Sequence, residues 1–192
     1  EVFANSEWPA GETGTKRTME RQADLTWWTY NGAGEGSGDA LILGTPKKEN
    51  MVKVISYGGG GGGGGAATAA VVETNNNSNT QPLKILISEV RAYPTDNRFV
   101  ELYNPNDSAI DLTNWYLQRK TQSGDSFSSL VSKTYFDGKT IGAHGYFVIS
   151  RNAMDGADIV LDSLTLTESN TIQLKNSVSE VADIVGWGQA SD

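Results

Sequence analysis

The sequence predicts an all-β fold, arranged as a sandwich or a barrel. In the second half of the chain, short runs of β-branched and aromatic residues recur roughly every ten residues, with polar turns between them. No segment repeats its apolar residues at the helical period. With 192 residues, 38% of them hydrophobic, the chain is long enough to bury one core. We therefore expect a single β domain.

Six strands are predicted in this second half, each bounded by turn-forming residues such as Pro, Asp and Asn. They cover residues 85–90, 99–103, 112–119, 145–149, 171–174 and 181–185. The polar stretch 175–180 separates the last two strands and predicts a hairpin.

The first 50 residues carry a weaker pattern. Residues 16–21 and 40–43 are predicted strands, the stretch 32–38 is a loop, and Gly44-Thr45-Pro46 ends the second strand. Two or three strands cannot bury a core alone, so this segment needs a partner sheet. We expect residues 85–192 to supply it, in the same chain or in a neighbouring one.

Between these parts lies a linker, predicted at residues 51–84. It contains eight consecutive glycines at 58–65, followed by Ala- and Asn-rich sequence that is typical of a flexible connection. No Gly-Lys-Ser or Gly-Lys-Thr follows the glycines, so the tract does not predict a phosphate-binding loop.

Composition disfavours several classes of function. The net charge of −8 is unsuited to nucleic acid, and no apolar run is long enough to predict insertion into a membrane. Cysteine is absent, which excludes disulfides and catalytic or metal-bound thiolates. The acidic, Gly-, Ser-, Thr- and Asn-rich composition favours a secreted or cell-surface protein. Since the sequence begins at Glu1, we expect a mature product, a cropped piece or one unit of a longer array.

Five motifs in the second half resemble the lamin tail domain in its bacterial form. They are Ile-Ser-Glu-Val (87–90), Phe-Val-Glu-Leu-Tyr-Asn-Pro (99–105), Ile-Asp-Leu-Thr-Asn-Trp-Tyr-Leu (110–117), Ala-His-Gly-Tyr-Phe-Val-Ile (143–149) and Ile-Val-Gly-Trp-Gly (184–188). The resemblance implies an immunoglobulin-like β-sandwich that serves as a non-catalytic module on secreted and surface proteins.

The order of the pieces departs from that family. After its Gly-Trp-Gly motif the family continues with a strand that has a basic end and then a Thr-Pro stop, and residues 1–50 resemble this missing part at 7–12, 18–21 and 41–46. Residues 1–50 are therefore predicted as permuted or donated C-terminal strands, and residues 85–192 as the N-terminal and central strands. Closure within one chain, exchange between chains and a covalent tandem array all remain open.

Few residues suggest chemistry. His144 is the only histidine, and its Ala-His-Gly-Tyr context predicts a turn. Glu89 and Glu101 lie on adjacent predicted strands like the carboxylates of a glycosidase, but their positions in the period-2 alternation predict outward, solvent-facing side chains. The Asp and Asn groups at 96–97, 106–107 and 155–158 lack the spacing of a calcium loop. The sequence identifies no Lys and Asn or Asp pair for an isopeptide cross-link.

The tryptophans divide into two groups. Trp115 and Trp187 follow core-like positions and are predicted to be buried. Trp27 and Trp28 lie in a polar region and, together with Trp8, are candidates for an exposed partner or assembly contact.

Two functions are compatible with these features. We favour a non-catalytic extracellular structural protein, a subunit or repeat of a filament or surface array whose partners are copies of itself. The alternative is a self-closed adhesion or glycan-binding module that uses Trp27, Trp28 and the glycine-rich loop to hold surface glycans. An enzyme is disfavoured because no set of nucleophile, base and orienting group is evident, and no cofactor is predicted.

Overall fold

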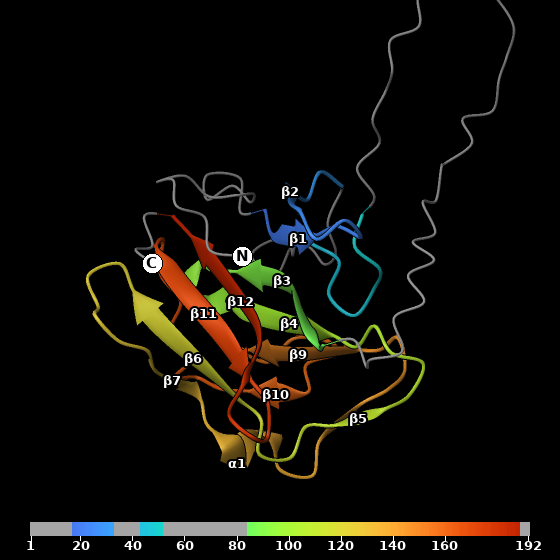
Figure 1. Ribbon diagram of the computed structural model, residues 1–192. Helices are drawn as coiled ribbons and strands as arrows, with labels where there is room; N and C mark the ends of the chain where they lie inside the picture. Colours follow the sequence, from blue (N-terminus) through green and yellow to red (C-terminus); the bar gives the residue numbers. More distant parts are fainter. Residues whose placement is uncertain (1–16, 33–42, 52–83, 189–192) are drawn as a thin grey trace, which may run out of the picture.

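The structure, a computed structural model, describes residues 17–32, 43–51 and 84–188 (Figure 1). These residues form strands with one short α-helix, α1, and a single 3-10 turn, Thr95–Asn97. The elements are β1 Met19–Arg21, β2 Trp27–Thr29, β3 Leu86–Arg91, β4 Phe99–Tyr103, β5 Ile110–Asp111, β6 Tyr116–Thr121, β7 Ser128–Val131, α1 Lys133–Phe136, β8 Thr140–Ile141, β9 Tyr146–Ser150, β10 Ile159–Val160, β11 Asn170–Lys175 and β12 Val181–Trp187. No helix in the described part of the chain is long and apolar enough to cross a membrane.

Two sheets make up the fold. The larger has the strand order β10-β9-β4-β3-β1-β2, and the smaller has the order β12-β11-β6-β7. Figure 1 shows the smaller sheet lying across the larger one, which is the arrangement of a β-sandwich. The predicted all-β, immunoglobulin-like fold is confirmed.

The core lies between the two sheets. Val90, Val100 and Ile149 face it from neighbouring strands of the larger sheet, and Ile172 and Val185 face it from the smaller sheet. Alternate residues of each strand reach this core because side chains on a strand point to opposite faces in turn.

Aromatic side chains extend this core. Trp115 and Trp187 are buried, as predicted. Phe136 of α1 is also fully buried and stacks on Phe147, with 5.9 Å between the ring centroids. The helix therefore contributes its one buried residue to the core.

All six predicted strands of the second half exist, with small changes at their ends. The largest change is at residues 112–119, where β6 begins only at Tyr116. A turn precedes it, closed by the bond from the Trp115 N–H to the Leu112 carbonyl at 2.9 Å, with Asn114 at a φ of 67°. Strands β5, β8 and β10 are two residues long, too short for any sequence period to reveal them.

The N-terminal segment completes the larger sheet. β1, inside the predicted strand 16–21, pairs antiparallel with β3, and β2 pairs with β1. Of the predicted strand 40–43 only Leu43 is described, and it forms a parallel bridge with Arg17. The rest of that strand, Trp8 and residues 52–83 of the predicted linker lie outside the described residues.

Candidate functional site

Three glutamates lie side by side on the face of the larger sheet that points away from the core. Glu20 of β1 pairs with Glu89 of β3, and Glu89 pairs with Glu101 of β4. Paired residues on neighbouring strands project to the same face, so the three carboxyl groups form one line across the sheet. We call these residues the glutamate row.

Residues 43–51, which we call the strap, donate hydrogen bonds to both ends of this row. The Thr45 hydroxyl donates to Oε1 of Glu20 at 2.7 Å, and the Met51 N–H donates to its Oε2 at 3.0 Å. The Lys47 N–H donates to Oε2 of Glu101 at 2.5 Å. The strap thus binds the row largely through backbone N–H groups.

The beginning of the strap lies directly against Glu89. A Cβ atom placed on Gly44 would lie 2.0 Å from Oε1 of Glu89, so any other residue at this position would displace the Glu89 carboxyl group. The Asn50 side chain donates to the carbonyls of Arg21, at 2.9 Å, and Ser88, at 3.0 Å, which joins the strap to β1 and β3.

The row is buried, which corrects one prediction from the sequence. Glu89 and Glu101 do point away from the core, but they are 0% exposed, and Glu20 is 1% exposed. The strap covers this face, and it comes from a part of the chain far from β3 and β4. A β-bulge between Ile87 and Glu89 also brings the Ser88 hydroxyl to this face, where it donates to Oε1 of Glu101 at 2.7 Å.

Burial changes the acidity of all three groups. It raises the pKa of Glu89 well above the ordinary 4.5, and the neighbouring charges of Glu101 and Glu20 raise it further. Burial also raises the pKa of Glu101, to about 7, although bonds from the Lys47 N–H and the Ser88 hydroxyl and the charge of Lys47 oppose the rise. The pKa of Glu20 is raised by burial too. Of the three groups, Glu89 has the surroundings that most oppose its ionisation.

Glu89 has the poorest surroundings for a negative charge. Neither of its oxygens has a hydrogen bond of normal geometry to a described residue. The Thr18 hydroxyl and the Thr45 N–H lie close enough to lower its pKa, but by less than burial and its acidic neighbours raise it. Two carboxylates about 5 Å apart repel each other by roughly 3 kcal/mol at an effective dielectric constant near 20. A fully ionised row would therefore be strained.

A buried ion pair holds the same N-terminal segment to the smaller sheet. Nη1 of Arg21 lies 2.5 Å from Oδ2 of Asp183 on β12, and the same oxygen accepts the Ile87 N–H at 2.8 Å. The guanidinium group also lies over the ring of Trp27, 5.5 Å from its centroid. Residues from both sheets thus hold β1 in place.

A third contact lies in the middle of the strap. The Lys47 ammonium group pairs with the Asp158 carboxylate and donates to the Tyr146 carbonyl at 2.7 Å. Asp158 also accepts the Val148 N–H at 2.7 Å, so the pair is anchored to β9. The glutamate row, Asp183 and Asp158 together make up the docking site of residues 17–51.

The tryptophans proposed as contacts have different positions. Trp27 is only 8% exposed and belongs to the core, which corrects the expectation that it is exposed. It faces inward because it is adjacent to Trp28 on β2, and successive residues of a strand point to opposite faces. Trp28, opposite Glu20, is partly exposed, and its role as a contact stays a prediction. Trp8 lies outside the described residues.

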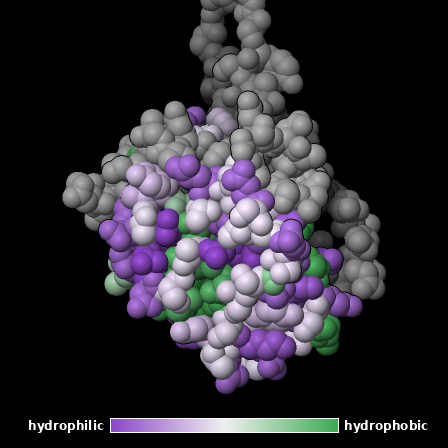
Figure 2. Space-filling view, turned by 90° about the vertical axis from the view of Figure 1, so that its left-hand side faces the viewer, coloured by the Kyte–Doolittle hydropathy of each residue, from purple (hydrophilic) through white to green (hydrophobic). Residues whose placement is uncertain are grey.

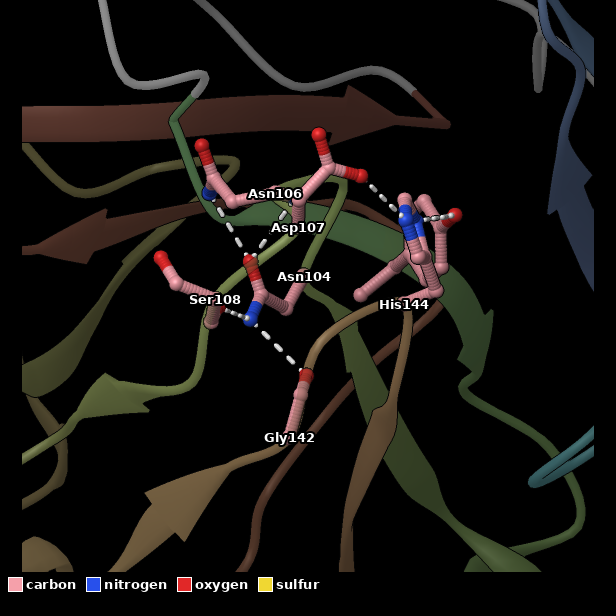
Figure 3. A network of polar contacts seen from close by, with 7 residues as sticks. Asn104, Asn106, Asp107, Ser108, Gly142 and His144 are labelled. Carbon is pink, nitrogen blue, oxygen red and sulfur yellow. Dashed lines mark hydrogen bonds and ion pairs between the residues drawn. The ribbon is translucent and has the colours of Figure 1, made fainter.

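His144 lies in a turn, with a φ of 51°. Its Nε2 is 2.8 Å from Oδ1 of Asp107, and both side chains are largely exposed (Figure 3). The neighbouring Asn104 is fully buried and donates to the carbonyls of Ser108 and Gly142, both at 2.8 Å. This network connects two loops. Within the described ranges, no three His, Cys, Asp or Glu side chains are arranged to hold a metal ion.

The arrangement at the glutamate row is that of a docking surface. The strap lies on the carboxyl groups, so the row differs from the open pair of carboxylates that a glycosidase places on either side of its substrate. A search of sequence families matches residues 64–189 to the Lamin Tail Domain. No curated protein matches the chain.

Proposed function

This chain belongs to the lamin tail domain family, and from that membership we propose that it is a non-catalytic structural module of an extracellular filament or surface array. In this proposal, residues 17–51 of one copy complete the sandwich of the next copy. β1 and the strap are the donated elements, and the edge of β3 with the glutamate row is the surface that accepts them.

The observation that carries the proposal is the way residues 17–51 close the fold. They supply two strands of the larger sheet and the strap on its outer face, yet they lie outside the matched residues 64–189. Without them β3 would be an edge strand with unpaired N–H and C=O groups, and the glutamate row would be uncovered. The rest of the domain therefore needs a donor.

The length of the connection permits a donor in another copy. Residues 52–83 separate the donated elements from the accepting ones, and an extended chain of that length reaches about 100 Å. The same hydrogen bonds and ion pairs can therefore form within one chain or between two. When donor and acceptor are different surfaces, exchange between copies is head-to-tail and gives a filament or a closed ring.

The oligomeric mass after refolding tests this proposal. We expect light scattering coupled to size exclusion to show a mass that rises above 20.6 kDa with concentration, over a hundredfold range, once the chain has been unfolded and refolded. A mass of 20.6 kDa at every concentration would mean that each chain closes on itself.

A capping variant sharpens this test. The chain with Gly44→Leu keeps its acceptor surface but cannot donate its strap, because the new side chain collides with Glu89. When this variant is added to the unfolded wild-type chain before refolding, it should stop the growth of the assemblies and lower their mean mass. Val178→Ala, at a residue that is 71% exposed, is the matched control and should leave the mass unchanged.

One observation favours a second function. In this structure β1 pairs with β3 of the same chain, and Trp28 stays partly exposed on the edge strand β2. A self-closed module of this kind would suit adhesion, with Trp28 stacking on a surface glycan. Binding on a glycan array that is lost in Trp28→Ala would support it, and an array at background level would count against it.

A further inference from the structure

We infer that docking of the strap on the glutamate row is linked to proton uptake, so that the row accepts the strap in a protonated form and releases it more readily as the pH rises from about 5 to about 8. This inference rests on the proposed function only where the strap comes from a second copy, since the same contacts form within one chain.

The geometry of the row is the first argument. Three carboxyl groups lie on three adjacent strands, each opposite the next, and all are buried beneath the strap. Like charges directly opposite each other destabilise a sheet, and burial removes the water that would screen them. Undocking of the strap would return water to this face.

The charges around the row do not neutralise it. The described titratable or charged side chains that face it are Arg91 on β3, Tyr103 on β4, Tyr146 on β9, Lys47 and Glu49 on the strap, and Asp158 next to β10.

Only two of these side chains are cations. Lys47 already pairs with Asp158, and the Nε of Arg91 donates to the Tyr93 carbonyl at 3.3 Å while its charge acts mainly on Glu89. Three ionised glutamates would therefore leave an excess of buried negative charge. A proton bound to the row removes that excess.

The hydrogen bonds indicate which group ionises first. Glu101 accepts the Lys47 N–H and the Ser88 hydroxyl, one on each oxygen, and Glu20 likewise accepts one bond on each oxygen, so hydrogen bonds support the charged forms of both. Glu89 has no comparable partner among the described residues. As the pH rises, Glu101 should lose its proton near 7, and Glu89 should lose its proton well above the ordinary 4.5.

The sign of the effect follows from these pKa directions. A carboxyl group whose pKa is raised by docking stabilises the docked state. This stabilisation is fully present at pH values below the undocked pKa of the group, near 4.5. That stability is lost as the pH rises through the docked pKa, which is about 7 for Glu101. The docked segment is therefore expected to be more stable at pH about 5 than at pH about 8.

Carboxyl titration by NMR tests the inference directly on the full-length wild-type chain. With ¹³C-labelled glutamate, we expect one side-chain carboxyl of the row to titrate near 7 and a second to titrate well above 4.5. Titration of all three groups at or below about 4.5 would overturn the inference. This measurement does not depend on any variant being able to fold.

Urea unfolding of a neutral variant links the proton to stability. The wild-type midpoint should fall by roughly 1 M between pH about 5 and about 8. Glu101→Gln keeps an oxygen that can accept the Lys47 N–H but carries no charge, so its midpoint should change by less than that of wild type. Glu180→Gln, at an exposed residue of the β11–β12 hairpin, should behave like wild type. Equal pH dependence in wild type and Glu101→Gln would overturn the inference.

These results separate the inference from the proposed function. Titration near 7 in a chain whose mass stays at 20.6 kDa would keep the proton linkage and reject assembly between copies. Assembly between copies without a carboxyl group that titrates near 7 would keep the proposed function and reject the proton linkage.

Discussion

Gly188 illustrates how a single residue of the Gly-Trp-Gly motif is fixed by its surroundings. Its φ is 65°, in the left-handed region, and a Cβ atom there would lie 2.1 Å from the Glu168 carbonyl oxygen. The adjacent Trp187 donates its indole N–H to the Thr167 carbonyl at 2.8 Å, so the motif closes against the chain before β11. Both conformation and space therefore require glycine.

Replacing this glycine should be costly. We expect Gly188→Ala to lower the free energy of unfolding by about 3 kcal/mol, from the left-handed backbone and the collision together. Gly142→Ala is the matched control, because nothing lies within 4 Å of its Cβ position, and its cost should be about 0.5 kcal/mol or less. Urea unfolding of both variants measures the difference. Equal free energies of unfolding for Gly188→Ala and Gly142→Ala would show that the surroundings of Gly188 do not require glycine.

At the scale of elements, β1 depends on an ion pair that joins the two sheets. Arg21 and Asp183 are both largely buried, and Asp183 also accepts the Ile87 N–H. Removal of one partner leaves the other charge buried without compensation, whereas apolar replacement of both is often nearly neutral. The pair thus fixes the position of β1 more than it adds to net stability.

This reasoning predicts a non-additive pair of substitutions. Asp183→Leu alone should lower the free energy of unfolding by about 3 to 5 kcal/mol, because Arg21 loses its partner, and Arg21→Leu alone should also lower it, because Asp183 loses its partner. The double variant Arg21→Leu with Asp183→Leu should recover most of that loss. Denaturant unfolding of the single and double variants provides the comparison, and simple addition of the two single losses would contradict the prediction.

Strands could be predicted from the sequence where apolar residues are dense. β4 and β9 are five residues long and rich in Val, Ile, Phe and Tyr, so their composition identifies them. β2 was missed because its Trp27-Trp28-Thr29 sequence is surrounded by polar residues, although alternation along a strand would have separated a buried Trp27 from an outer Trp28.

The docking site was only half predictable. The sequence places Glu89 and Glu101 on the same face of neighbouring strands, and the structure confirms this. Their burial depends on the strap, which lies about 40 to 55 positions earlier in the chain, and no local pattern encodes that contact. Glu20 was not selected for the same reason, since its neighbours are known only once β1 pairs with β3.

At the scale of the whole molecule, the domain is assembled from two separate stretches of chain. Figure 2 shows one face of the molecule, where purple hydrophilic residues are interspersed with white and green ones. The net charge of the whole chain is −8. Only noncovalent contacts in the described regions join residues 17–51 to residues 84–188.

A cut between the two stretches tests whether these contacts suffice. We expect a chain with a protease site placed in the glycine tract 58–65 to keep both pieces together in size exclusion after cleavage, because β1, the strap and Arg21 remain docked. The same cut in a Gly44→Leu chain should release the N-terminal piece. Separation of the wild-type pieces in native buffer would contradict the noncovalent docking described above.

The pairing of β1 with β3 also orders events during synthesis of the chain. Met19 is made 71 positions before its partner Val90, and Arg21 is made long before Asp183. On a ribosome β1 therefore emerges well before the strand that it binds. Until β3 has been made, β1 has no pairing partner in its own chain, and its ion pair with β12 can form only after nearly all of the described chain has been made.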